Sequence, residues 1–142
     1  MLQRCLVWSA VRLATLGAMA GCVDRASILV RAGPEVGDVV FHINASDSDG
    51  RRLSRLSDIR VVRKDCAERG TSLESMWLSY AENGVGPSPA PASIGYGIRP
   101  EGFVDQVAPR PLIEGCYEVS VGAPKVRGSA EFVIGAGLRL VE

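Results

Sequence analysis

Short runs of alternating apolar and polar residues make up most of the chain after residue 38. In residues 39–45, Phe41 and Ile43 share one face of an extended strand with Val39, and His42 lies on the other face. Turn residues separate further runs of this kind, at 59–64, 75–81, 92–98, 116–121, 129–134 and 138–141. No amphipathic helix of convincing length interrupts them. We therefore predict about seven strands in an all-β domain.

This number of short strands in a chain of this size is typical of an antiparallel β-sandwich. The chain has 142 residues, of which 46% are hydrophobic, enough for the core of one domain. A proline-rich stretch at 84–92 is expected to be an exposed loop, because proline cannot donate to a central strand. Dividing the chain there would leave halves too small to fold alone. We predict a single sandwich over residues 38–142.

The first 21 residues predict an export signal. Arg4 and Arg12 give a positively charged start without an acidic residue, and a short apolar stretch and small residues follow. The uncharged stretch at 13–21 is about half of the roughly 20 residues that span a bilayer. We expect residues 1–21 to be a signal peptide and the protein to be exported or anchored.

Two cleavage sites are consistent with this leader. The small-x-small pattern at 18–20 predicts a cut that leaves Gly21 first. Met19-Ala20-Gly21-Cys22, however, resembles the lipobox of bacterial lipoproteins, in which the cysteine receives a diacylglycerol and the chain is cut before it. The resemblance implies a lipidated Cys22 at the start of a segment 22–37 that is either a tether or a first strand. The alternative is that Cys22 is merely a small apolar residue beside an ordinary cleavage site.

The four cysteines favour the lipobox interpretation. Cys5 would leave with the leader and lipid would cap Cys22, so Cys66 and Cys116 remain as an even pair. We expect these two to form a disulfide, because exported proteins mature under oxidising conditions. They are too far apart in the sequence for a C-x-x-C motif, which argues against zinc binding and redox catalysis.

Charge argues against nucleic acid as a partner. Removing the leader takes Arg4 and Arg12 from the 16 basic side chains and none from the 16 acidic ones, so the net charge becomes about −2. Val23 follows Cys22, whereas lipoproteins kept at the inner membrane of enteric bacteria carry aspartate at that position. The lipoprotein resemblance therefore implies an outer-membrane anchor with the domain facing the periplasm.

A second resemblance concerns the domain itself. The order Cys66, Trp77, Cys116 and Tyr117 resembles that of immunoglobulin-like domains, where a disulfide joins the two sheets beside a buried tryptophan. Residues 112–119 also resemble the tyrosine corner of immunoglobulin-like and fibronectin-type domains, which implies a Tyr117 hydroxyl bonded back to the preceding turn. Because the cysteine directly precedes the tyrosine here, the disulfide either crosses the core or connects a strand end to a loop.

Residues 94–103, together with 112–121, are also similar to small uncharacterised proteobacterial lipoproteins. That group has no established activity, so the likeness implies only architecture and location.

Motifs for catalysis or metal binding are weak. His42 is the only histidine and has no nucleophile motif near it, so we expect no catalytic triad. The acidic turn at 47–50 does not fit an EF-hand, because Ala45 and Leu56 would occupy ligand positions. Carboxylates that a cell-wall hydrolase would need are scattered, at Glu101, Asp105, Glu114 and Glu118. We predict no enzyme, no cofactor and no metal.

The strongest candidates for a binding surface are Tyr96, Arg99, Phe103 and Arg110, because aromatic residues and arginine are enriched in binding hot spots. The alternative is that Tyr96 and Phe103 cover the edge of the core and the arginines are solvated. The leading hypothesis is a non-enzymatic envelope lipoprotein that contacts a protein or a ligand. Two alternatives remain: an immunity lipoprotein that neutralises a periplasm-acting toxin, and a small cell-wall hydrolase.

Overall fold

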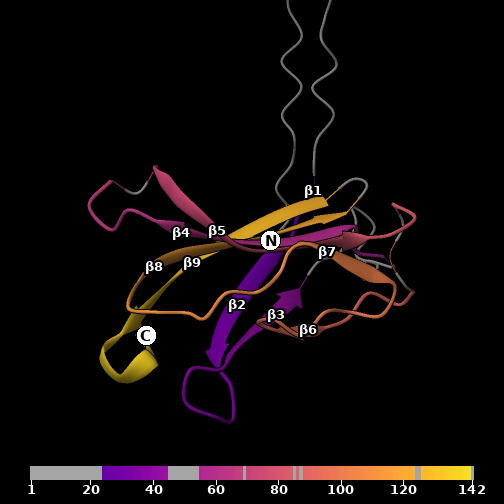
Figure 1. Ribbon diagram of the computed structural model, residues 1–142. Helices are drawn as coiled ribbons and strands as arrows, with labels where there is room; N and C mark the ends of the chain where they lie inside the picture. The colour runs from indigo at the N-terminus through magenta and orange to yellow at the C-terminus, as the bar shows by residue number, and fades with distance from the viewer. Residues whose placement is uncertain are drawn as a thin grey trace, which may run out of the picture.

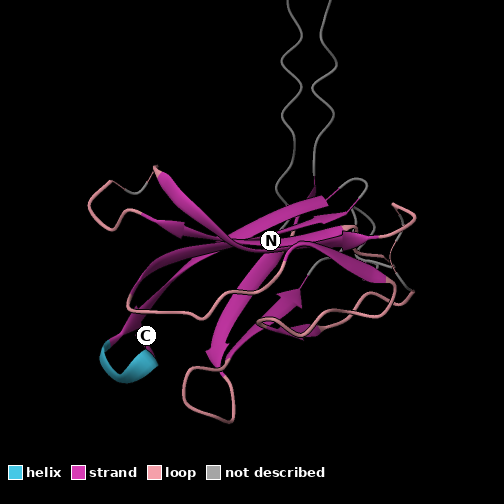
Figure 2. Ribbon diagram, viewed as in Figure 1, coloured by secondary structure: helices cyan, strands magenta, loops and turns pink. Residues whose placement is uncertain are grey.

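The computed structural model describes residues 24–44, 55–68, 70–84, 86, 88–123 and 126–141. Figure 1 traces this part of the chain, and Figure 2 shows that it consists of strands and loops with one short helical turn near the C-terminus. Its single helical element is the short 3-10 turn η1 (Ala136–Leu138). The lipobox and the acidic turn at 47–50 lie outside the described residues, so their predictions stay untested.

The described strands form two facing sheets (Figure 1). In chain order they are β1 (Asp24–Arg25), β2 (Ser27–Ala32), β3 (Val39–Asn44), β4 (Asp58–Lys64), β5 (Ser72–Ala81), β6 (Ser93–Gly95), β7 (Phe103–Val107), β8 (Gly115–Ala123), β9 (Val126–Gly135) and β10 (Arg139–Val141). The larger sheet has the order β1-β9-β8-β4-β5-β7, and β10 also pairs with β9. The smaller sheet has the order β2-β3-β6. All pairs are antiparallel except β1 with β9, so the predicted β-sandwich is confirmed.

Most of the predicted strands are present, with two differences. The run at 92–98 is a strand only over Ser93–Gly95, because the chain turns at Tyr96 and Gly97, whose φ of 74° suits glycine. Strand β7 was not predicted. Within the segment 22–37, the described residues form β1 and β2 from Asp24 onward, which agrees with the first-strand alternative. The sandwich therefore begins at Asp24 and not at residue 38.

Aromatic side chains from both sheets meet in the core. The ring of Phe132 on β9 stacks on Tyr117 of β8, with ring centroids 5.3 Å apart, and lies 5.8 Å from Phe41 of β3. Phe41 and Tyr117 are almost completely buried. Because burying one such side chain contributes about 1.5–3 kcal/mol, this contact between the layers stabilises their packing.

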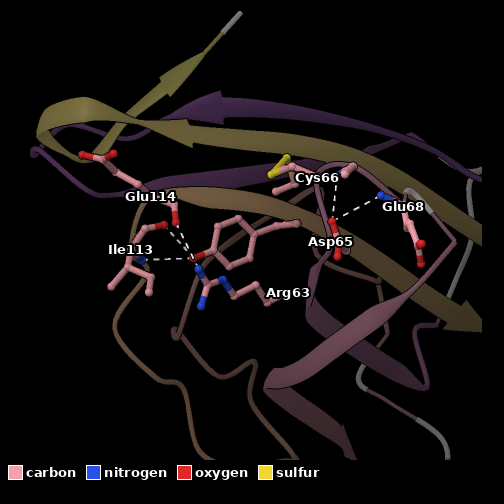
Figure 3. Close-up of a disulfide and its surroundings, with 9 residues drawn as sticks. Arg63, Asp65, Cys66, Glu68, Ile113 and Glu114 are labelled. Atoms are coloured by element: carbon pink, nitrogen blue, oxygen red, sulfur yellow. Dashed lines mark hydrogen bonds between the residues drawn. A yellow bond between two sulfur atoms is a disulfide. The ribbon is translucent and has the colours of Figure 1, made fainter.

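The predicted disulfide between Cys66 and Cys116 is present, and the two α-carbons are 5.3 Å apart (Figure 3). Cys116 lies on β8 opposite Lys64, the last residue of β4, and Cys66 comes two residues later. The bond thus connects the end of β4 to its neighbour β8 in the same sheet. It does not cross the core, which decides between the two placements left open by the sequence.

The tyrosine corner is also present. The Tyr117 hydroxyl donates to the carbonyl of Ile113 at 2.7 Å and accepts from the amide N–H of Ile113 at 3.0 Å (Figure 3). Gly115 lies between them with a φ of 154°, next to the Arg63 side chain. The turn before β8 is therefore held to the strand by a side chain from the core.

Candidate functional site

The residues predicted to form a binding surface gather beside β5, but not all of them are on the surface. Tyr96 and Arg99 belong to the loop between β6 and β7, and Arg110 belongs to the segment after β7. Phe103 begins β7 and is only 4% exposed, as a member of the hydrophobic core. It is therefore a packing residue, as the alternative interpretation of the sequence proposed for it.

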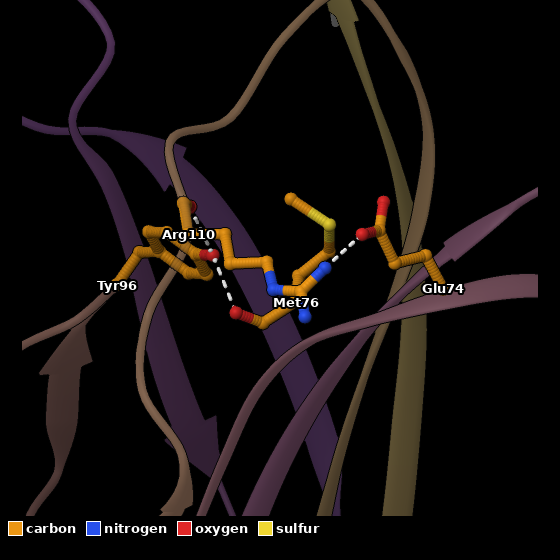
Figure 4. Close-up of polar contacts among 4 residues, drawn as sticks. All are labelled: Glu74, Met76, Tyr96 and Arg110. Carbon is orange, nitrogen blue, oxygen red and sulfur yellow. Dashed lines mark hydrogen bonds and ion pairs between the residues drawn. The ribbon is translucent and has the colours of Figure 1, made fainter.

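Tyr96 clamps two backbone segments together (Figure 4). Its hydroxyl lies 2.7 Å from the carbonyl oxygen of Arg110 and 3.2 Å from that of Met76 on β5. The amide N–H of Arg110 also donates to the Met76 carbonyl, at 3.0 Å. Burial raises the pKa of the Tyr96 phenol from 10.0 to about 12, so the hydroxyl keeps its proton. The segment after β7 is thus fixed against β5.

A buried tryptophan connects this clamp to the neighbouring arginine. The Tyr96 ring packs edge-on against Trp77, with ring centroids 5.8 Å apart. The Trp77 indole N–H donates to a carboxylate oxygen of Asp105 at 3.1 Å, which satisfies a polar group inside the core. The other Asp105 oxygen lies 3.9 Å from the Arg99 guanidinium. Asp105 therefore has one side toward the core and the other toward an exposed cation.

Arg110 makes the second exposed ion pair of the cluster, with Glu74 of β5 (Figure 4). The side chains of Arg110 and Glu74 are 55% and 42% exposed, and that of Arg99 is 54% exposed. Exposed ion pairs contribute only about 0–1 kcal/mol to stability. The cluster thus combines a rigid backbone with charged side chains that are easily re-paired.

Asp105 and Glu118, two of the carboxylates considered for a hydrolase, lie far apart in the large sheet. Asp105 lies on β7 and Glu118 on β8, and strands β4 and β5 separate them, which corresponds to about 14 Å at normal strand spacing. Glycosidases need carboxylates about 5–9.5 Å apart. Glu118 instead accepts a bond from Lys64 at 3.1 Å. Among the residues that the structure describes, no three side chains of a metal-binding type are grouped.

His42 lies exposed on β3, opposite Leu29 of β2 and Ser93 of β6. Of the structural and surface roles that the sequence allows for this histidine, the structure shows a surface position.

A separate hollow of about 680 Å³ lies over β8 and β9 and is not part of this cluster. Its lining includes Glu118, Ser120, Arg127 and Ser129. Ala26, Val121 and Gly128 complete the lining, so the hollow lacks the mainly apolar lining that is usual for small-molecule sites.

The sequence analysis missed the partners of the cluster. Glu74 is 36 residues from Arg110, and the Trp77–Asp105 bond spans 28 residues. A strand pattern predicts which face a residue occupies but not which strand lies beside it, so no spacing signalled these contacts.

The fold and this cluster define a single-domain β-sandwich with a clamped, charged loop beside its outer strands. Searches against protein-family models, curated proteins and solved structures found no match to this chain. Within the described ranges, a helix with the length and apolar character of a membrane span is not found.

Proposed function

We propose that this chain is a lipid-anchored protein of the cell envelope. In this proposal Cys22 carries a diacylglycerol, and the sandwich faces the periplasm from the outer membrane and acts by contact. The observation that carries the proposal is the position of the motif Met19-Ala20-Gly21-Cys22, which stands directly before β1 at Asp24. A cut before Cys22 would remove the leader and leave every strand of the sandwich intact.

The use of the other cysteines supports this assignment. Cys66 and Cys116 are paired, and Cys5 lies within the leader. Cys22 is then the cysteine that remains for acylation in an exported chain. A mature chain with two or three acyl groups would be held firmly, since one chain alone gives only marginal binding.

For contact with a partner, we propose the surface formed by Arg99 and Arg110 with the exposed edge of Tyr96. The Arg110–Glu74 pair is exposed, so a partner carboxylate can replace Glu74 at low cost. The Arg99 guanidinium is also exposed and can bind a second carboxylate beside the partly buried Asp105. The backbone beneath Arg110 is fixed by Tyr96, so little ordering of the loop is needed on binding.

The anchor is tested by mass spectrometry of the mature protein. We expect an amino terminus at Cys22 that carries lipid. The variant Cys22→Ser is expected to remain as uncut precursor, whereas Cys5→Ser, a matched change within the leader, matures normally. An unmodified terminus at Gly21, or normal maturation of Cys22→Ser, would contradict the proposal.

The contact surface is tested separately, by a photo-crosslinking amino acid placed at Arg110. Arg60, an exposed arginine on β4, provides the matched control position. We expect an adduct in intact cells that forms from position 110 and not from position 60, and that Arg99→Glu weakens. The same adducts from both positions would show that this surface has no special role.

A further inference from the structure

The sandwich begins almost at the proposed anchor. Only Val23 stands between Cys22 and the first paired residue, Asp24, which lies opposite Val126 of β9. An extended chain covers at most about 3.6 Å per residue, so the α-carbons of Cys22 and Arg25 are within about 11 Å of each other. A lipid on Cys22 would therefore hold one end of the sandwich close to the membrane surface.

A single cross-strand row connects β1 with the far edge of the large sheet. It contains one residue from each strand in order, namely Arg25, Arg127, Gly122, Asp58, Tyr80 and Val104. Because paired residues lie at the same level of a sheet, this row marks the end nearest Cys22. We refer to this end as the anchor end.

Tyr80 is the exposed aromatic side chain of this row, in which Arg127 is exposed as well. It is 41% exposed, and its neighbours Ser79 and Ala81 are almost completely buried, so Tyr80 points outward from β5. No hydrogen bond to its hydroxyl is found within the described residues. Tyrosine and tryptophan favour the membrane–water interface, because their rings prefer an apolar surrounding and their polar atoms prefer water.

Some of the other exposed apolar side chains lie at the opposite end, whereas Leu29 lies on β2 and Ile98 in the loop between β6 and β7. Val36 is in the turn between β2 and β3, and Leu138 is in η1 between β9 and β10. Leu73 is the second residue of β5, beside the turn that carries Cys66. The two ends of the sandwich therefore present different surfaces, and Tyr80 belongs to the end that the anchor reaches.

We infer that the anchor end rests on the lipid bilayer, with Tyr80 at the level of the headgroups and the turns that hold Val36 and Leu138 facing away. This inference rests on the proposed lipidation of Cys22 and adds an orientation to it. The Arg110 part of the contact surface then lies away from the membrane, whereas Asp105, the partner of Arg99, lies opposite Ser79 and so nearer to the anchor end. Glu74, the ion-pair partner of Arg110, lies opposite Arg63 of β4, six strand positions from Tyr80 along β5.

The orientation is tested by tryptophan fluorescence of the mature lipidated chain in phospholipid vesicles. Two variants each add a tryptophan, Tyr80→Trp at the anchor end and Val36→Trp at the opposite end. Trp77, which is buried, also emits, and its emission is measured in the parent chain and subtracted. With lipids brominated in the upper acyl chain, we expect about half of the added emission to be quenched for Tyr80→Trp and almost none for Val36→Trp, as for an interfacial ring.

A linker variant is the matched control. Twelve glycine and serine residues inserted between Cys22 and Val23 behave as a flexible chain with an r.m.s. length of about 20 Å. They leave the lipid in place but release the anchor end, so the quenching of Tyr80→Trp should fall toward that of Val36→Trp.

Vesicle flotation separates the two ways in which this inference could fail. A chain that floats but shows equal quenching at both positions, or quenching that the linker leaves unchanged, overturns the orientation and leaves the anchor standing. A chain that does not float overturns the proposed anchor, and the orientation falls with it.

Discussion

Tyr117→Phe removes one oxygen atom from a side chain that is 1% exposed. The ring itself stays, so its stacking on Phe132 at 5.3 Å is expected to persist. The lost atom is the one that donates to the Ile113 carbonyl at 2.7 Å and accepts from the Ile113 N–H at 3.0 Å. The substitution therefore tests the tyrosine corner without disturbing the core.

The expected cost follows from those two bonds. Removing one partner of a buried hydrogen bond costs about 1–3 kcal/mol, because the other partner loses its solvation without compensation. Ile113 is at the surface, where water can replace part of each bond, since 48% of it is exposed. We therefore expect Tyr117→Phe to lower the free energy of unfolding by about 2 kcal/mol.

Urea unfolding of the disulfide-bonded chain measures this loss. The midpoint should fall at an unchanged slope, because the surface exposed on unfolding stays the same. Tyr80→Phe is the matched control, as Tyr80 lies on the surface, and should change stability by less than about 0.5 kcal/mol. If Tyr117→Phe fell within that same margin, the corner would not restrain the turn and the reasoning would be wrong.

Three further changes test other parts of the fold. Reducing the Cys66–Cys116 disulfide should lower the free energy of unfolding by about 4 kcal/mol, because the unfolded chain regains the conformational entropy of the 50-residue loop that the bond closes. Equal melting temperatures with and without reductant would contradict this. Gly128→Ala should destabilise the chain by about 1–3 kcal/mol in urea unfolding, because the new Cβ would collide with the backbone carbonyl oxygen of Ala26, which lies between β1 and β2. The control Gly70→Ala places its Cβ where no atom lies within 4 Å and should be neutral. Tyr96 has a pKa of about 12 in the folded chain and about 10 in the unfolded chain, so between these pH values only the unfolded state ionises and is favoured. The stability that the protonated Tyr96 contributes is therefore complete below pH 10 and is lost as the pH rises to about 12. Tyr96→Phe should make the fall of unfolding free energy over this range less steep, and an unchanged slope would show that Tyr96 is not its source.

The strands could be predicted where one face is buried and the other is solvated. On β8, Tyr117 and Val119 are buried while Glu118 is partly exposed, and this alternation is visible in the sequence. Strand β7 lacks that signal. It pairs only with β5, and Asp105 turns toward the indole of Trp77. A carboxylate on the inner face breaks the expected alternation, and its reason lies on another strand.

The candidate site could be predicted only in part, for a similar reason. The loop that carries Tyr96 and Arg99 was found because aromatic residues and arginine occur together there. Phe103 was placed with them, although it begins an inward-facing strand and is 4% exposed. Sequence alone does not distinguish an aromatic residue that binds from one that packs, since both use the same chemistry. The exposed partner Glu74 depends on how β5 pairs, which no local pattern contains.

The two tyrosines give the charged surface its rigidity. Tyr96 fixes the chain at Arg110, and Tyr117 fixes the same connection a few residues later, at Ile113. The disulfide joins β8 to the end of β4, outside the connection between β7 and β8, so it stabilises the sheet and not the segment that carries Arg110. Arg110 is therefore held by hydrogen bonds that need no oxidation. For the proposed contact surface, this rigidity would reduce the entropy that a contact must overcome on binding.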